Sequence, residues 1–164
     1  MQTNYDIMKN LELKTVITEY KMEELCEEER QLVEQAIEAT DRSYAPYSKF
    51  RVGAAVMLDN GVTFLGCNQE NASYPVGLCA ERTALFAAGV QFPDVPVRLM
   101  AIAARNTDGV LLEEPISPCG MCRQAIIETE TRFNHPVRIL LYGTNRIYAV
   151  DSIKTLMPLS FTEF

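Results

Sequence analysis

The sequence has no tryptophan, only one histidine and little positive charge. A single histidine excludes any metal site that needs two imidazoles from the same chain. Its 15 Lys and Arg residues stand against 22 Asp and Glu residues, which gives a formal net charge of −7. Proteins that wrap nucleic acid carry basic stripes that release counterions from phosphate, and this sequence has none. We therefore expect no nucleic-acid partner, and the cysteines must supply any metal or thiol chemistry.

Long apolar segments are also missing. The longest apolar stretches, such as Thr83–Val90, are shorter than the roughly 20 residues that cross a bilayer. Residues 1–10 lack the apolar core of a secretory signal peptide. The five cysteines are an odd number, which fits poorly with a framework of disulfides. We expect a protein of the reducing cytoplasm without a membrane partner, in which closely spaced cysteines indicate metal binding or catalysis.

The remaining composition, with 48% hydrophobic and 23% charged residues, is ordinary for a folded protein. Apolar residues recur at helical spacing from Leu25 to about Ser43, which predicts a first helix. The patterns that follow predict strands at 50–58, 62–67, 97–104, 137–142 and 146–150, and helices at 79–89, 119–133 and 152–156. This order predicts the α/β class, as a three-layer α/β/α sandwich with one mixed five-stranded sheet.

The chain is expected to have two parts. Residues 21–164 are interpreted as a single domain, because no repeat, low-complexity tract or linker divides them. Residues 1–20 are interpreted as an N-terminal extension, in which Leu11–Thr18 is rich in β-forming residues. The extension could add an edge strand to the sheet, or it could reach a neighbouring subunit as an arm.

Two cysteine motifs carry the clearest chemical signal. Cys79 starts one predicted helix, and Cys119 and Cys122 lie in the first turn of another, each after a long loop. The N–H groups and dipole of a helix N-terminus stabilise thiolates. Cys119 and Cys122 face the same side of their helix at this spacing, so Cys79 can converge on them. Three thiolates predict a catalytic zinc site, because such sites keep three protein ligands and leave the fourth position to water.

Glu81 makes this expected metal site a candidate active site. It follows Cys79 by two residues, so its carboxylate can exchange protons between the activated water and a substrate nitrogen. Cys-x-Glu followed by Pro-Cys-x-x-Cys is typical of zinc deaminases. Zinc with three thiolates carries a formal charge of about −1, which favours a nearby cation. Arg82 and Arg123 both follow ligands closely, and we predict that Arg82 donates hydrogen bonds to the ligand sulfurs.

Other interpretations of the cysteines are weaker. A closed structural site formed with Cys67 is disfavoured, because such sites usually use two paired-cysteine knuckles and only one pair is present. A redox pair of Cys119 and Cys122 would leave Glu81 unexplained. Cys26 and Cys67 are therefore interpreted as bystanders, and His135, which precedes a proline, as a surface residue.

Further motifs accompany the two cysteine motifs. They are Tyr-Ala-Pro-Tyr-Ser-Lys-Phe at 44–50, Val-Gly-Ala-Ala at 52–55, Gly-Cys-Asn-Gln-Glu-Asn-Ala at 66–72 and Leu-Met-Pro-Leu-Ser-Phe at 156–161. With them, the chain from Leu25 to Phe161 resembles the small, homotetrameric, three-cysteine cytidine deaminases. Residues 1–20 are not covered by the typical short form of that family. The resemblance implies a homotetramer with one Zn²⁺ per subunit, held by Cys79, Cys119 and Cys122.

The resemblance also implies the reaction, which is hydrolytic deamination of cytidine and 2′-deoxycytidine in pyrimidine salvage. Zinc-bound hydroxide would attack C4 while Glu81 shuttles protons, and ammonia would leave. Phe50 would stack on the pyrimidine, and Asn68 and Glu70 would bind the ribose hydroxyls. Backbone groups around Ala80 and Cys119 would contact the edge of the base. Tyr74 and Phe161 match residues that complete a neighbouring subunit's pocket in this family. The preference between the two sugars stays open.

Three rival functions are distinguishable. Antibiotic-directed nucleoside deaminases share the cysteine motifs, but the Asn68-Gln69-Glu70 segment suits a ribose. A deaminase that edits nucleic acid is disfavoured by the charge of −7. A zinc-stabilised binding module without catalysis predicts a saturated four-cysteine site and no effect of Glu81 substitution on turnover.

Overall fold

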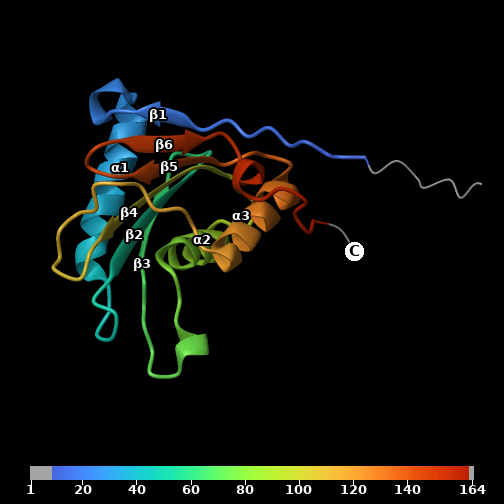
Figure 1. Ribbon diagram of the computed structural model, residues 1–164. Coiled ribbons are helices and arrows are strands. Elements are labelled where there is room, and N and C mark those ends of the chain that lie inside the picture. The colour runs from blue at the N-terminus through green and yellow to red at the C-terminus, as the bar shows by residue number, and fades with distance from the viewer. Residues whose placement is uncertain (1–8, 163–164) are drawn as a thin grey trace, which may run out of the picture.

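The fold is built on one mixed β-sheet. The computed structural model describes residues 9–162, with six strands in the order β1-β6-β5-β4-β2-β3 (Figure 1). The strands are β1 (Thr18–Tyr20), β2 (Arg51–Leu58), β3 (Thr63–Cys67), β4 (Val97–Arg105), β5 (Arg138–Tyr142) and β6 (Ile147–Val150). The helices are α1 (Glu27–Ala39), α2 (Ala80–Gln91) and α3 (Gly120–Phe133), with 3₁₀ turns at Met22–Glu24, Thr40–Arg42, Tyr74–Val76 and Ile153–Leu156. β4 and β5 pair in parallel, and the other neighbouring strands pair antiparallel.

Helices cover both faces of the sheet. Successive side chains of a strand point to opposite faces, and β2 shows this alternation clearly. Ala54 and Val56 belong to the core cluster that contains residues of α2 and α3, whereas Ala55 and Met57 belong to the cluster that contains residues of α1. Figure 1 shows α1 on one side of the sheet and α2 with α3 on the other. The predicted three-layer α/β/α sandwich is confirmed.

Two glycines allow the helices to approach the sheet closely. A Cβ atom on Gly66 of β3 would lie 2.3 Å from the Ala80 carbonyl oxygen and 2.5 Å from the Ala84 amide nitrogen. A Cβ atom on Gly53 of β2 would similarly lie 2.1 Å from the Ala36 carbonyl oxygen of α1. All three distances are far below van der Waals contact, so only glycine fits at these two positions. The first turn of α2, which follows Cys79, is therefore packed directly against the sheet.

The sheet has six strands where five were predicted, and the added strand is β1. It begins at Thr18, so it overlaps the predicted β-rich stretch Leu11–Thr18 by a single residue. β6 has only four residues and pairs with Thr18 through Tyr20 in antiparallel register. Residues 9–17 precede that register and form neither helix nor strand. Residues 1–8 of the predicted extension lie outside the described part of the chain.

Two predicted helix boundaries also differ. α2 continues past Gly89 to Gln91, because Gly89 does not adopt the positive φ that would end a helix there. The segment predicted as a short helix at 152–156 is a 3₁₀ turn. None of the helices in residues 9–162 has the length and apolar character needed to cross a membrane.

Candidate metal centre and active site

Two of the three predicted zinc ligands are helix N-cap residues. Cys79 precedes α2 and Cys119 precedes α3, both in extended conformation with ψ of 154° and 167°. Their carbonyl oxygens accept the first helical hydrogen bonds, from the Thr83 amide at 3.0 Å and the Arg123 amide at 2.9 Å. The N–H groups of each first turn have no partner within the helix, so both thiols lie at electropositive ends.

The three thiols converge as the spacing predicts. The Cys79 and Cys119 sulfurs lie 3.8 Å apart, those of Cys119 and Cys122 lie 3.4 Å apart, and all three fall within 4.8 Å of one another. A tetrahedral zinc with Zn–S bonds of about 2.3 Å places its sulfurs about 3.8 Å apart, so the cluster fits this ion. Among the described residues, no other group of three His, Cys, Asp or Glu ligands forms.

Cys67 does not take part in the cluster. Its thiol instead donates to the Arg42 carbonyl oxygen at 3.2 Å and accepts from the Gln69 amide at 3.2 Å. Three cysteines therefore leave one position of a tetrahedral ion open, as catalytic zinc sites require. The closed four-cysteine interpretation has no structural support.

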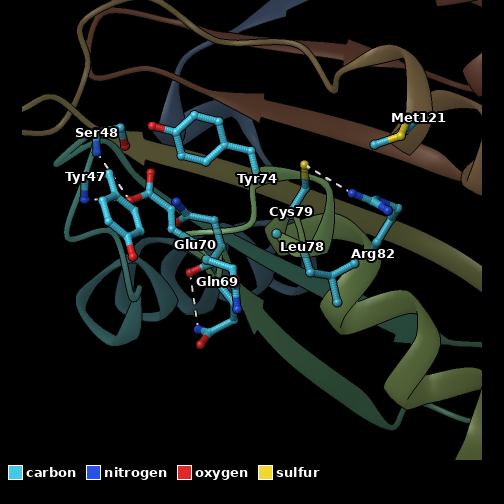
Figure 2. A pocket seen from close by; sticks show the side chains of 12 residues that line it. Tyr47, Ser48, Gln69, Glu70, Tyr74, Leu78, Cys79, Arg82 and Met121 are labelled. Carbon is cyan, nitrogen blue, oxygen red and sulfur yellow. Dashed lines mark hydrogen bonds between the residues drawn. The ribbon is translucent and has the colours of Figure 1, made fainter.

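The two candidate arginines point to different partners. Arg82 Nη2 lies 3.8 Å from the Cys79 sulfur and donates to it (Figure 2). Arg123 donates to the Pro118 and Leu156 carbonyl oxygens at 2.8 and 2.6 Å, and to the Ser117 hydroxyl at 2.9 Å. Arg82 is therefore the cation beside the thiols, and Arg123 is committed to neighbouring segments of the chain.

The metal-free thiols differ in acidity. A hydrogen bond from Cys122 is the main cause that lowers the pKa of Cys79 to about 5, and Arg82 lowers it further, against the effect of burial. The pKa of Cys122 is raised, chiefly because this thiol donates to Cys79 and also because it is buried. In the metal-free protein, Cys79 therefore carries the thiolate and Cys122 keeps its proton.

Glu81 lies in the first turn of α2 and forms a side-chain hydrogen bond with Cys122. Its residue surface is only 5% exposed, and burial is the main cause that raises the pKa of its carboxyl group. The negative charge of Cys79 raises that pKa further, whereas a hydrogen bond with Cys122 lowers it. A carboxyl group with a raised pKa can both accept and return a proton near neutral pH.

A cavity of about 550 Å³ opens beside the cluster. Its lining residues are Tyr47, Ser48, Asn68, Gln69, Glu70, Asn71, Tyr74, Gly77, Leu78, Cys79, Arg82 and Met121. Figure 2 shows Cys79 and Arg82 at one side of this cavity and Tyr47 with Glu70 at the other. Three residues predicted to contact substrate or a neighbouring pocket, Asn68, Glu70 and Tyr74, therefore share one cavity with the Cys79 thiol.

Asn68 and Glu70 also fix the segment that faces them. The Asn68 amide accepts from the Val52 backbone N–H at 2.8 Å and donates to the Phe50 carbonyl oxygen at 3.0 Å. Glu70 Oε2 accepts from the Tyr47 N–H at 2.9 Å and from the Ser48 N–H at 3.2 Å. A side-chain hydrogen bond with Ser48 is the main cause that lowers the pKa of Glu70. Glu70 is therefore a charged group at the cavity wall.

Two aromatic residues that were predicted to contact the substrate or a neighbouring pocket lie outside this cavity. Phe50 and Phe161 are not among the residues that line the cavity. Phe161 is 64% exposed, and its carbonyl oxygen accepts from the Gln124 side chain at 3.0 Å. Ala80, whose backbone was predicted to contact the base, is fully buried as the first residue of α2.

Sequence reasoning gave no role to two cavity residues, Tyr47 and Met121. Tyr47 packs edge-on against Tyr74 with ring centroids 6.3 Å apart, and both side chains line the cavity. Met121 is 61% exposed and projects from the first turn of α3. Helical spacing gave no signal for it, because a residue two positions after Cys119 does not share the face of the ligands.

An open metal position beside a proton-exchanging carboxyl group defines a metal-dependent hydrolase. The family model described as "Cytidine and deoxycytidylate deaminase zinc-binding region" matches residues 26–134. This match spans more than half of the chain, which therefore belongs to that family of zinc-binding deaminases. Its cofactor is zinc, for which Cys79, Cys119 and Cys122 are the available ligands.

Individual relatives agree with this assignment. A cytidine deaminase from Sporosarcina psychrophila is 43% identical over 100 residues, which cover 59% of this chain and 66% of the relative. A cytidine deaminase from Halalkalibacterium halodurans is 41% identical over 97 residues, covering 59% and 68%. The crystal structure of a cytidine deaminase from Burkholderia pseudomallei superposes with a TM-score of 0.69 at 37% identity, covering 80% of this chain and 97% of that one. The chain thus spans about two thirds of the sequence relatives' length and nearly all of the structural one.

Proposed function

We propose that this chain hydrolyses cytidine and 2′-deoxycytidine to uridine and 2′-deoxyuridine, with release of ammonia. The observation that carries the proposal is a buried carboxyl group, Glu81, beside a three-thiol centre, of which Cys79 lines a cavity together with Asn68 and Glu70. The relatives whose names state cytidine deaminase support the choice of substrate.

The steps of the reaction follow from the position of Glu81. When bound by the three cysteines, zinc lowers the pKa of its water and so supplies a nucleophile near neutral pH. Glu81 would accept a proton from this water and deliver it to ring N3, and the resulting hydroxide would add to C4. Glu81 then transfers the second proton to the exocyclic amine, and the C4–N bond breaks to release ammonia. The water supplies all the atoms that the products gain.

The polar residues of the cavity suit the sugar. We assign the ribose hydroxyls to Asn68 and Glu70, which both line the cavity, and Figure 2 shows the Glu70 carboxylate on the opposite side from Cys79. Phe50, held at its carbonyl by Asn68, would stack on the base, and backbone groups at Ala80 and Cys119 would contact its edge. The charged carboxylate of Glu70 disfavours the phosphates of a nucleic acid, in line with the net charge of −7.

Further proposals concern the whole protein. We propose that residues 21–164 act as one deaminase domain and that residues 1–20 extend it. Four copies would assemble into a homotetramer in which Tyr74 and Phe161, respectively 78% and 64% exposed, complete neighbouring pockets. Light scattering should then give a mass near four times 18.5 kDa. A cytoplasmic role in pyrimidine salvage agrees with five cysteines that are all free thiols.

The decisive experiment is an assay of purified, zinc-loaded protein with its zinc content measured. Cytidine should be converted with one ammonia released per uridine, and a chelator that removes the zinc should abolish the reaction. The panel should include 2′-deoxycytidine, free cytosine, a cytosine-containing antibiotic and single-stranded DNA. Turnover of the antibiotic or the DNA without turnover of either nucleoside would overturn the proposal, as would a zinc-loaded protein inactive on every compound.

A further inference from the structure

Arg123 links two segments of the chain that lie far apart in sequence. Its Nε donates to the Pro118 carbonyl oxygen and its Nη2 to the Ser117 hydroxyl, both in the loop that leads into Cys119. Its Nη1 donates to the Leu156 carbonyl oxygen, at the end of the last 3₁₀ turn. The Arg123 guanidinium therefore connects the loop before Cys119 to the C-terminal segment.

α3 holds the C-terminal segment, residues 152–161, at two other positions. The buried carboxylate of Glu130 accepts from the Ser152 hydroxyl at 2.7 Å and from the Ile153 N–H at 2.9 Å. The Gln124 amide donates to the Phe161 carbonyl oxygen at 3.0 Å. Of these three helix residues, Arg123 is the one that also contacts the loop before Cys119.

We propose that Arg123 is a positioning residue that couples zinc retention to the docking of the C-terminal segment. It directly follows Cys122, and its own amide closes the first turn of α3 on the Cys119 carbonyl oxygen. Its side chain orients the loop that delivers Cys119, so two of the three thiols depend on its geometry. Groups that orient metal ligands typically contribute 10–100-fold to metal affinity.

The planar fork of arginine is necessary for this role. Three acceptors on two segments are bound by three different nitrogens of one rigid group. A lysine keeps the charge but offers a single nitrogen, which cannot reach all three acceptors in these directions. Coupling of this kind is reciprocal. If docking of the C-terminal segment strengthens zinc binding, then bound zinc strengthens the docking of that segment by the same factor.

The test measures zinc release and does not depend on which substrate the protein deaminates. Zinc-loaded wild type, Arg123→Lys and Arg123→Ala are mixed with a chromogenic chelator, and the release rate is recorded. Arg123→Ala should release zinc about 10–100-fold faster than wild type, and Arg123→Lys should also release it faster. The matched control is Arg132→Lys on the same helix, whose guanidinium donates only to the Pro93 carbonyl oxygen among the bonds described; it should leave the rate unchanged.

A second readout separates positioning from simple stabilisation. Lys154 is exposed in the C-terminal segment, so trypsin cleavage there, followed by mass spectrometry, reports undocking. Removal of zinc should speed this cleavage in wild type and should have little effect in Arg123→Ala, where the coupling is already lost. The proposal is wrong if the Arg123 variants release zinc at the wild-type rate, or if zinc has no effect on cleavage at Lys154 of wild type. Should Arg123→Ala fail to fold, Arg123→Lys decides by the same criteria.

Discussion

Glu81 is the residue on which the proposed reaction depends most directly. Its buried carboxyl group, with a raised pKa, can exchange protons near neutrality, whereas an amide cannot. Glu81→Gln should therefore lower kcat by about 10²–10⁴-fold, the usual contribution of general acid–base catalysis. Its zinc content, measured by atomic absorption, should match wild type, because glutamine at 81 leaves the three thiols intact. Wild-type turnover in a fully zinc-loaded variant would remove Glu81 from the mechanism.

Arg82 contacts one of the proposed zinc ligands, the Cys79 sulfur. The hydrogen bond from Arg82 helps to lower the pKa of Cys79. Arg82 should therefore reduce the negative charge on this sulfur when it binds the zinc ion. Without it, the more electron-rich thiolates should make the activated water less acidic. Arg82→Gln should lower kcat by about tenfold while most zinc stays bound. The measurement is kcat normalised to zinc content; an unchanged value would show that the thiolates need no cation.

At the scale of residues, the thiol cluster and the two neighbouring arginines differ in how far the sequence predicts their contacts. The thiol cluster was predictable, because helix periodicity and two helix starts determine which sulfurs can meet. The Arg82 contact with Cys79 was predictable as well, but the partners of Arg123 were not, because two of them are carbonyl oxygens that tertiary packing brings to its side chain. Leu156, which binds Arg123, is 33 residues further along the chain. Spacing alone could not connect the two.

At the scale of elements, Glu130 joins the end of α3 to the segments that follow. Its carboxylate accepts from the Val137 N–H, the Ile153 N–H and the Ser152 hydroxyl, and the residue is 4% exposed. Glu130→Gln replaces one acceptor oxygen by an NH₂ group that faces donors. It should reduce the free energy of unfolding by about 2 kcal/mol, the scale of hydrogen bonds to a buried charge.

Urea unfolding of Glu130→Gln provides the measurement, with Glu128→Gln as the control. Glu128 lies on the same helix and is exposed, so its substitution should change stability by less than about 0.5 kcal/mol. Equal unfolding free energies for the two variants would show that Glu130 is not an anchor.

Most elements were predictable, either from a helical stripe of apolar residues or from a short continuous apolar run, which is typical of a strand covered on both faces. β2 alternates between two cores, and α1 buries one stripe that includes Leu32, Val33 and Ala36. β1 was misplaced because a three-residue edge strand has no pattern of its own. Its position depends on the register of β6, which is a contact with the opposite end of the chain.

At the scale of the whole molecule, the thiols link pH to metal loading. The pKa of Cys122 is raised in the metal-free protein, so this thiol still holds its proton at neutral pH. Zinc binds thiolates, so uptake must displace at least that proton, and the affinity must increase with pH. Each proton displaced changes the apparent affinity by about tenfold per pH unit. Competition titrations of the metal-free protein on both sides of neutrality provide the test; an affinity independent of pH would contradict the assignment of the proton to Cys122.

The three-layer architecture was predictable at this scale, because helices alternate with apolar strands throughout the chain. The shape of the cavity was not, because it joins the 44–52 segment, the loop after β3 and the first turn of α3. The loop after β3 projects away from the sheet and carries Tyr74 (Figure 1). Its contact with Tyr47 depends on how both segments are held by Glu70 and its neighbours.

β1 has a consequence for the behaviour of the protein in a crowded solution. Without it, β6 would be the open edge of the sheet, and its sequence Ile-Tyr-Ala-Val is apolar and β-forming. Such an edge is a template for strand pairing between molecules, the first step of aggregation. β1 occupies that edge with three residues, including Glu19, whose carboxylate pairs with Arg146. At this end of the sheet, the short and charged β1 is therefore a poorer template for pairing with another copy than β6 would be.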